Sequence, residues 1–173
     1  MDRDGVLVRE VDYLSRPSQL SVLPGVPQAM KTLRAAGFKL VVVTNQSGVA
    51  RGYFSLTALA KIHRKLKHRL AKSGAKWDAL YFSPHAGDST HPWRKPGTGM
   101  LKAAKKRYGL DFTASYMIGD KTADTLAGNR AGCTSIIVRT GYGGRDGKYP
   151  KAKPAKTCRD LAAAARWILA RES

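Results

Sequence analysis

The sequence has few cysteines, few acidic residues and no long apolar run. Its two cysteines, Cys133 and Cys158, lack the Cys-x-x-Cys spacing of redox and zinc motifs. We therefore expect free thiols in a cytoplasmic protein, which excludes a disulfide-stapled secreted scaffold. No apolar stretch approaches the roughly 20 residues that a membrane-spanning helix needs. We expect no membrane association.

The shortage of acids leaves a strongly basic chain. Lysine and arginine number 31 against 12 aspartates and glutamates, giving a net charge of +19 and a pI of about 10.3. Such a field attracts phosphorylated metabolites, nucleic acid or an anionic membrane surface. Much of the surplus lies in residues 61–72, with more in 105–107 and after Gly141. A solvated helix face would explain these runs equally well, so charge alone leaves the partner open.

Short apolar runs alternate with longer amphipathic segments along the chain. With 173 residues and 43% hydrophobic content, we expect one domain spanning residues 1–173. The alternation predicts an α/β fold with a mainly parallel sheet covered on both faces. The strands are expected at 38–45, 77–84, 114–120 and 134–141, and the helices at 26–36, 56–73, 98–108, 122–131 and 159–170. A long surface loop is expected over 141–157.

Polar residues close each predicted strand. Because ligands bind at the carboxyl ends of parallel strands, these residues should meet at one edge of the sheet. Carboxylates, cations and hydroxyls gathered in this way suit phosphoryl transfer, in which one carboxylate attacks phosphorus and a second protonates the leaving oxygen. A divalent cation would screen the clustered negative charge. The set comprises Asp2, Asp4, Thr44, Asn45, Ser47, Arg94, Lys95, Asp120 and Asp124.

The segments "DRDGV", "VVVTNQSGVARGYFS", "RKPGTGM", "SYMIGDKTAD" and "VRTGYGG" make the chain recognisable. They closely resemble the haloacid dehalogenase (HAD) superfamily and, within it, the D,D-heptose 1,7-bisphosphate phosphatases, which group with histidinol-phosphate phosphatases. The resemblance extends nearly continuously to Gly144. It implies a three-layer Rossmann-like fold without a cap domain, and a Mg²⁺-dependent phosphatase that works through an aspartyl phosphate.

The resemblance also implies a role for each site residue. Asp2 would be the nucleophile, and Asp4 would be the general acid and then the base that activates water. The Asp2 carboxylate, the Asp4 backbone carbonyl and the Asp120 carboxylate would hold Mg²⁺. Thr44, Asn45 and Lys95 would bind the transferring phosphoryl group. The rest of the substrate would meet Glu10, Tyr13, Gln46, Ser47, Arg94 and Lys121.

Two residues keep alternative roles at this point. Asp124 could bind the metal, but bonding to loop amides is the favoured role. Arg51 would either contact a second phosphate or brace its own loop, and the sequence does not choose between these roles.

The sequence departs from the family at a loop that often carries zinc in related enzymes, bound by Cys-x-His and Cys-x-Cys pairs. Here Ser83, His91 and Trp93 replace the cysteines, and only His85 persists. Two histidines without a thiolate or carboxylate partner make a poor tetrahedral site. We expect no zinc, with packing by Trp93 holding the loop instead.

A second departure lies at Asp2. In this superfamily the nucleophile ends a central apolar strand, whereas only Met1 precedes Asp2 here. A nucleophile on a fraying terminus would be poorly held. We therefore expect the first strand to be missing from this sequence and the natural protein to begin at least one strand earlier. The alternative is a true truncation with weak or no activity.

Three functions follow from these observations. The favoured one is hydrolysis of a sugar phosphate, most closely D-glycero-D-manno-heptose 1,7-bisphosphate to the 1-phosphate, by a monomer acting on a small molecule; histidinol phosphate is an alternative substrate. A nucleic-acid 3′-phosphatase would suit the net charge, but no aromatic-rich basic groove supports base stacking. The third is an inactive phosphate-binding relic.

Overall fold

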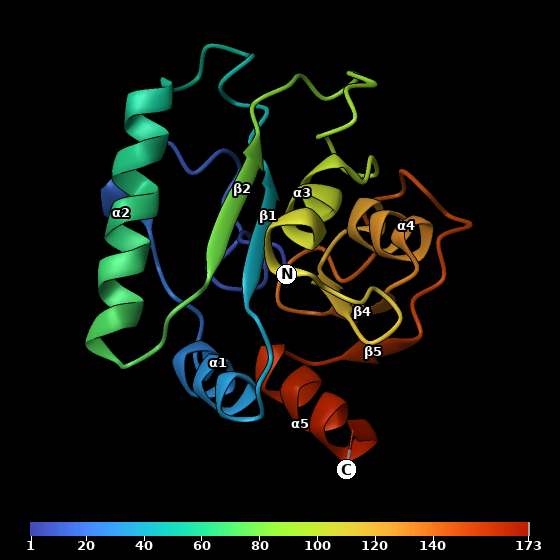
Figure 1. Ribbon diagram of the computed structural model, residues 1–173. Helices are drawn as coiled ribbons and strands as arrows, with labels where there is room; N and C mark the ends of the chain where they lie inside the picture. Colours follow the sequence, from blue (N-terminus) through green and yellow to red (C-terminus); the bar gives the residue numbers. More distant parts are fainter. Residues whose placement is uncertain (173) are drawn as a thin grey trace.

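The computed structural model describes residues 1–172, in which strands and helices alternate as predicted (Figure 1). The strands are β1 (Val41–Asn45), β2 (Ala79–Ser83), β3 (Tyr116–Gly119), β4 (Thr134–Val138) and β5 (Lys156–Cys158). The helices are α1 (Val26–Ala35), α2 (Leu56–Lys72), α3 (Gly99–Tyr108), α4 (Thr122–Ala131) and α5 (Leu161–Glu172), preceded by a 3₁₀ turn, η1 (Pro17–Gln19).

The sequence did not predict β5, which lies at the end of the expected 141–157 loop. Two of its three residues are exposed and only Cys158 is buried. A segment this short and polar has no apolar period that would reveal a strand. It is formed because its backbone pairs in parallel with Ile136–Val138 of β4. The prediction of a continuous loop was therefore wrong at that end.

All strand pairs are parallel, as expected. β1 pairs with β2, and β3, β4 and β5 form a second group in that order. The first two residues of the chain lie between the groups (Figure 1). Met1 N donates to Val41 O and Met1 O accepts from Val43 N, while Asp2 N donates to Ile118 O, each at 2.9 Å. These bonds hold Asp2 between the carboxyl halves of β1 and β3.

An apolar groove of about 320 Å³ continues between β1 and β3 beside Met1, lined by residues such as Phe38, Val41 and Met117. The expectation of an apolar strand ahead of Asp2 stays a prediction.

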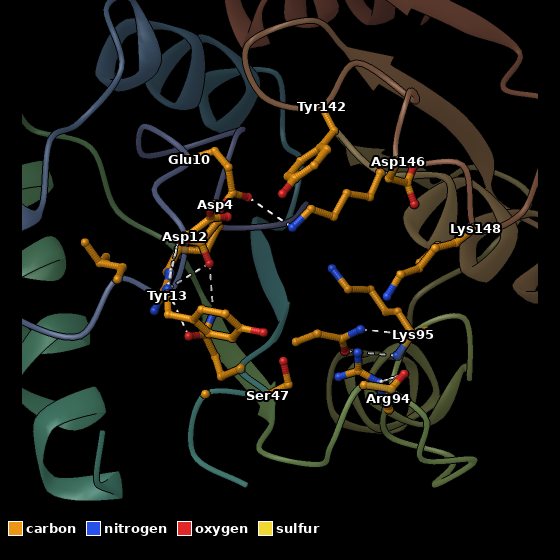
Figure 2. A pocket seen from close by; sticks show the side chains of 18 of the residues that line it. Asp4, Glu10, Asp12, Tyr13, Ser47, Arg94, Lys95, Tyr142, Asp146 and Lys148 are labelled. Carbon is orange, nitrogen blue, oxygen red and sulfur yellow. Dashed lines mark hydrogen bonds and ion pairs between the residues drawn. The ribbon is translucent and has the colours of Figure 1, made fainter. Parts of the chain in front are cut away.

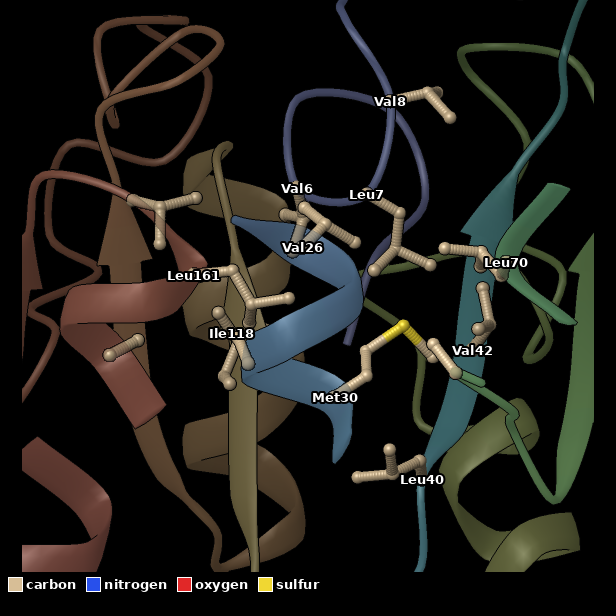
Figure 3. Close-up of a cluster of buried hydrophobic side chains, with 14 of the residues drawn as sticks. Val6, Leu7, Val8, Val26, Met30, Leu40, Val42, Leu70, Ile118 and Leu161 are labelled. Carbon is tan, nitrogen blue, oxygen red and sulfur yellow. The ribbon is translucent and has the colours of Figure 1, made fainter. Parts of the chain in front are cut away.

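Helices cover both faces of the strands. Neighbouring residues of a strand point to opposite faces. Val42 and Ile118 accordingly join a core built with α1, α2 and α5, which Figure 3 shows, while Val43 and Met117 join a smaller cluster with Met100 of α3. The expectation of an α/β fold with parallel strands is confirmed for the described residues, although the strands form two separate sheets instead of one, and no cap is evident among these residues.

Helix α2 carries much of the positive charge on its exposed side. Ser55 caps the helix by accepting a hydrogen bond from Ala58 N at 3.1 Å. Leu59, Ile62, Leu66 and Leu70 are buried, so most of the lysines and arginines between them face solvent. None of the helices in residues 1–172 is long and apolar enough to cross a bilayer.

Candidate active site

A pocket of about 270 Å³ opens near the carboxyl ends of β1 and β3 (Figure 2). The chain turns there directly from each strand into a polar loop, which brings together residues far apart in sequence. Asp2 and Asp120 are buried next to the lining residues. Nine of the predicted site residues line the pocket: Asp4, Glu10, Tyr13, Asn45, Gln46, Ser47, Arg94, Lys95 and Lys121.

Lys95 lies between two buried carboxylates. Its ammonium group is 3.1 Å from Asp2 Oδ1 and 2.6 Å from Asp124 Oδ1, and it donates to Val43 O at 2.8 Å. Burial alone would lower the pKa of Lys95, but Asp124 and Asp2 outweigh that effect and raise it. Burial likewise opposes ionisation of Asp2, yet Lys95 and Lys121 bring the pKa of Asp2 below its usual range. Lys95 is therefore a fixed cation beside an ionised Asp2.

Only one of the two carboxylate oxygens of Asp2 has a partner within residues 1–172. Its Oδ1 accepts from Arg3 N at 2.7 Å and contacts Lys95. No hydrogen bond from residues 1–172 reaches Oδ2, which is not among the fully buried, unsatisfied oxygens. Two donors thus fix the carboxylate through one oxygen and leave the other free to react.

Three buried carboxylates meet beside this pair. One oxygen each of Asp2, Asp120 and Asp124 lies within 4.8 Å of the others. Asp120 Oδ2 accepts from Tyr142 N at 2.8 Å, whereas Asp120 Oδ1 is buried and has no partner in the described residues. Burial, with Asp2 and Asp124 nearby, raises the pKa of Asp120 to about 8. A hard divalent cation such as Mg²⁺ fits this set, because it binds carboxylate oxygens and would satisfy the unpartnered one.

Asp124 is also held by loop and lysine contacts. Its Oδ2 accepts from Lys121 N at 3.0 Å and its Oδ1 pairs with Lys95. These bonds agree with the predicted structural role, although the same side chain belongs to the three-carboxylate cluster. Gly119 makes room for it, since a Cβ at that position would overlap the Asp124 side chain.

Asp4 is held in a network that the sequence did not reveal. The guanidinium group of Arg3, 1% exposed, pairs with both Asp4 oxygens at 2.7 and 2.8 Å. Arg3 also donates to Gln46 Oε1 and contacts His63 Nε2, each at 3.0 Å. Burial and then Arg3 lower the pKa of His63 to about 3, so this histidine of α2 is neutral and accepts from Arg3.

Gln46 and Asn45 use their side-chain amides within the protein. Gln46 Nε2 donates to Asp4 Oδ2 at 2.8 Å and to Thr44 Oγ1 at 2.9 Å. Asn45 Nδ2 donates to Lys95 O and Asn45 Oδ1 accepts from Lys95 N, both at 3.0 Å. These two residues thus hold Asp4 and Lys95 in position, a function distinct from the substrate contacts predicted for them. Thr44 is buried, and its hydroxyl keeps its own proton to donate.

Glu10 and Lys121 form an ion pair of 3.1 Å on the pocket wall. Burial alone would lower the pKa of Lys121, but Glu10 and Asp120 raise it, so the lysine stays charged. Its ammonium group lies 4.5 Å from the centre of the Tyr142 ring. Tyr13, which lines the same pocket, adopts φ 53° and packs edge-on against Tyr53.

The loop between β2 and Lys95 is held by packing and backbone bonds. Trp93 packs against Tyr81, and the rings of His85 and His91 stack with centroids 3.7 Å apart. Arg94 donates to His85 O at 3.0 Å and to Gly87 O at 3.3 Å. The expected lack of zinc stays a prediction, which elemental analysis of the purified protein would test.

Sequence reasoning missed several residues in this region: Arg3, His63, Tyr142, Asp146 and Lys148. Arg3 stood inside the quoted "DRDG" motif, where it was treated as a spacer between two aspartates. Its burial could not be predicted, because its partners Gln46 and His63 are 43 and 60 residues away. Arg51, predicted at the site, does not line the pocket but lies near its rim beside Gly87.

Comparison with known proteins agrees with this geometry. A family described as HAD-hyrolase-like matches residues 92–164. The chain is 44% identical to a D-glycero-D-manno-heptose-1,7-bisphosphate 7-phosphatase of Thermosynechococcus vestitus, over 97% of this chain and 93% of that protein. It is 37% identical to the D-glycero-β-D-manno-heptose-1,7-bisphosphate 7-phosphatase of Bordetella bronchiseptica, over 98% and 96% of the two chains.

Solved structures give the same result. The D,D-heptose 1,7-bisphosphate phosphatase of B. bronchiseptica, complexed with magnesium and phosphate, superposes with a TM-score of 0.89 at 37% identity, covering 99% of this chain and 97% of that one. The corresponding enzyme of Burkholderia thailandensis gives a TM-score of 0.73 at 30% identity, covering 97% and 95%. The chain therefore belongs to the D-glycero-D-manno-heptose-1,7-bisphosphate 7-phosphatase family of HAD-like hydrolases.

Proposed function

We propose that this protein is a Mg²⁺-dependent phosphatase that removes the 7-phosphate of D-glycero-D-manno-heptose 1,7-bisphosphate and leaves the 1-phosphate. The observation that carries the proposal is the cluster of three buried carboxylates, Asp2, Asp120 and Asp124, two of which pair with Lys95. Asp120 Oδ1 has no partner among residues 1–172, and Asp2 Oδ2 is free. The names of the relatives supply the substrate.

Asp2 Oδ2 attacks phosphorus in the first step, and the bond between phosphorus and the sugar oxygen breaks. Asp4 gives a proton to that oxygen, so the sugar leaves as an alcohol. Lys95 stays beside Asp2 and offsets the charge on the transferring group, together with the Thr44 hydroxyl. The product of this step is an aspartyl phosphate on Asp2.

Water attacks the same phosphorus in the second step. Asp4, now a carboxylate, removes the proton from the water, and the bond between phosphorus and Asp2 breaks to release inorganic phosphate. The bidentate Arg3 contact and the Gln46 amide hold Asp4 for both steps. Mg²⁺, held by Asp2, Asp120 and the Asp4 carbonyl, would neutralise charge on the phosphoryl oxygens when bound.

A phosphate-release assay with Mg²⁺ tests the proposal. Four esters are compared: heptose 1,7-bisphosphate, fructose bisphosphate, histidinol phosphate and a 3′-phosphorylated oligonucleotide. We expect the highest kcat/KM for the heptose ester and complete loss of release by folded Asp2→Asn and Asp4→Asn variants. A higher kcat/KM for the oligonucleotide or histidinol phosphate would move the function to that substrate. Activity in a folded Asp2→Asn variant would refute the covalent mechanism.

A monomeric state and a cytoplasmic location stay predictions, which sedimentation and cell fractionation would test.

A further inference from the structure

A long part of the chain carries positive charge with almost nothing to offset it. Between Asp12 and Asp78 the sequence contains no aspartate or glutamate, but it contains twelve lysines and arginines. Of these twelve, only Arg34 forms an ion pair within residues 1–172, and its partner is Asp78. Six of the twelve belong to α2. This helix is therefore the centre of the uncompensated charge.

Four cations of α2 form a row along its outer side, which we name the α2 stripe. Residues three, four and seven positions apart share one side of a helix. That spacing aligns Lys61, Arg64, Lys65 and Lys72, with His68 among them. All five are exposed except Lys65, which is half-buried. At a rise of about 1.5 Å per residue, the stripe is about 16 Å long.

The opposite side of α2 is occupied by the protein itself. Its apolar residues are each at most 1% exposed: Leu59, Ile62, Leu66 and Leu70. His63, which contacts Arg3 in the active site, is two residues from Lys61 and so lies on nearly the opposite side of the helix. Figure 1 shows α2 at the edge of the molecule. The α2 stripe is therefore directed away from both the core and the pocket.

The α2 stripe has no internal compensation. The helix contains no acidic residue, and none of its cations forms an ion pair with residues 1–172. Lys31 of α1 adds charge at the end of the helix, because a Cβ on Gly74 would lie 3.5 Å from Lys31 Cδ. Like charges three and four residues apart destabilise a helix. The arrangement is thus most favourable when an anion with many charges lies along it.

The shape and composition of this surface distinguish between polyanions. A helix that lies on an anionic membrane inserts its apolar side, whereas the apolar side of α2 is buried in the core. Single-stranded nucleic acid stacks on aromatic rings, and residues 61–72 contain no phenylalanine, tyrosine or tryptophan. Duplex DNA requires only cations on a convex element. Its phosphates are regularly spaced, and its major groove, about 12 Å wide, admits a helix of about 10–12 Å in diameter.

We propose that the α2 stripe binds the phosphate backbone of duplex DNA without sequence preference. Lysine and arginine contacts to phosphate, with release of the counterions of the DNA, supply the affinity and carry no sequence information. The inference goes beyond the proposed phosphatase activity and does not rest on it, because the stripe is directed away from the pocket. Binding is therefore measured with a chelator and without substrate, so that either conclusion can fail alone.

Fluorescence anisotropy with a labelled duplex of about 20 base pairs tests the proposal. The variant Lys61→Gln/Arg64→Gln/Lys72→Gln removes three cations from the α2 stripe. Its Kd for the duplex should rise at least about tenfold at about 50 mM salt. The slope of log K against log salt concentration should become shallower by about 3, one unit for each lost phosphate contact. A second duplex of unrelated sequence should bind equally tightly, and a clear preference for one duplex would contradict backbone binding.

A matched variant separates this surface from net charge. Lys102→Gln/Arg107→Gln/Lys106→Gln removes the same residue types and the same charge from exposed positions of α3. This control should bind the duplex as the unchanged protein does. Equal weakening by both variants would show that net charge alone governs binding, and would overturn the proposal. Unchanged binding by the α2 variant would overturn it as well.

Acetylation of the unchanged protein provides a test that needs no variant. Duplex DNA should slow the acetylation of Lys61 and Lys72 but not that of Lys102 and Lys106, as mass spectrometry would show. Equal protection of all four lysines would refute a site on α2. A single-stranded oligonucleotide of the same length and vesicles containing anionic lipid are the competing polyanions. Tighter binding of either one, with protection of Lys61 and Lys72, would assign the surface to that partner and overturn the proposal.

Discussion

Replacing Lys95 with methionine should destabilise the metal-free protein, because Lys95 is the cation that separates Asp2 from Asp124. Its contacts of 3.1 and 2.6 Å join side chains that are all less than 10% exposed. Removing one partner of a buried ion pair typically costs about 3–5 kcal/mol, because the charge left behind has no compensation. This is a large part of the roughly 5–15 kcal/mol of a typical domain. Methionine preserves most of the side-chain volume, so the loss reports charge.

The sign of the pH dependence follows from the carboxylates left behind. Burial raises the pKa of Asp124 even with Lys95 present. A carboxyl with a raised pKa binds a proton more tightly in the folded state, so stability increases as pH falls. The loss caused by Lys95→Met should thus be smaller near pH 5.5 than near pH 7.5. The phosphatase activity of Lys95→Met should also fall, by about 10²- to 10³-fold in kcat, as when one fixed hydrogen-bond donor to a transition state is removed.

Urea unfolding in the presence of a chelator, at both pH values, measures these effects. Lys102→Met is the control, because Lys102 is an exposed residue of α3 that makes no ion pair among residues 1–172. An unchanged unfolding free energy for Lys95→Met near neutral pH would refute the reasoning. So would a loss that grows as the pH falls.

Two further predictions concern Asp120 and His63. Because the pKa of metal-free Asp120 is about 8, Mg²⁺ binding below that pH should release a proton. The Kd for Mg²⁺ should therefore fall by up to about tenfold per pH unit as the pH rises toward 8. Calorimetry in two buffers would show the proton release, and a Kd that does not change with pH would contradict the prediction. His63→Leu should lower kcat and cost about 1–3 kcal/mol by leaving Arg3 Nη1 unpaired, whereas His63→Gln keeps an acceptor and should retain activity. The pKa of His63 lies near 3 in the folded protein, below its value in the unfolded chain. The unchanged protein should therefore lose stability relative to His63→Gln as the pH falls below about 6.5. If the two proteins lose stability equally in acid, a neutral, buried His63 is excluded.

The fold could be predicted wherever buried elements impose a period on the sequence. Val41–Asn45 is buried on both faces and reads as a continuous apolar run, and α2 shows four leucine and isoleucine residues at helical spacing. Short elements with little burial escaped prediction. β5 buries one side chain and forms through backbone pairing with β4, whereas η1 buries none and forms through local hydrogen bonds to Gln19.

The candidate site could be predicted as far as strand ends determine it. Parallel strands bring their carboxyl ends to one edge, so Thr44, Asn45 and Asp120 were expected together from topology alone. Arg3, His63 and Asp146 could not be predicted in the same way. Their positions depend on side-chain contacts between residues 24 to 60 apart in sequence, and such contacts impose no periodic pattern.

The scarcity of acidic residues becomes informative once their positions are known. Seven of the twelve lie in or beside the site: Asp2, Asp4, Glu10, Asp12, Asp120, Asp124 and Asp146. The remaining surface therefore carries nearly all of the positive charge with few acids to offset it. A field of this sign draws phosphate esters toward the protein from a distance, while the carboxylates of the site are offset at contact range by Lys95, Arg3 and Lys121. Attraction of the substrate and binding of a divalent cation can thus coexist in one small domain, since they operate over different distances.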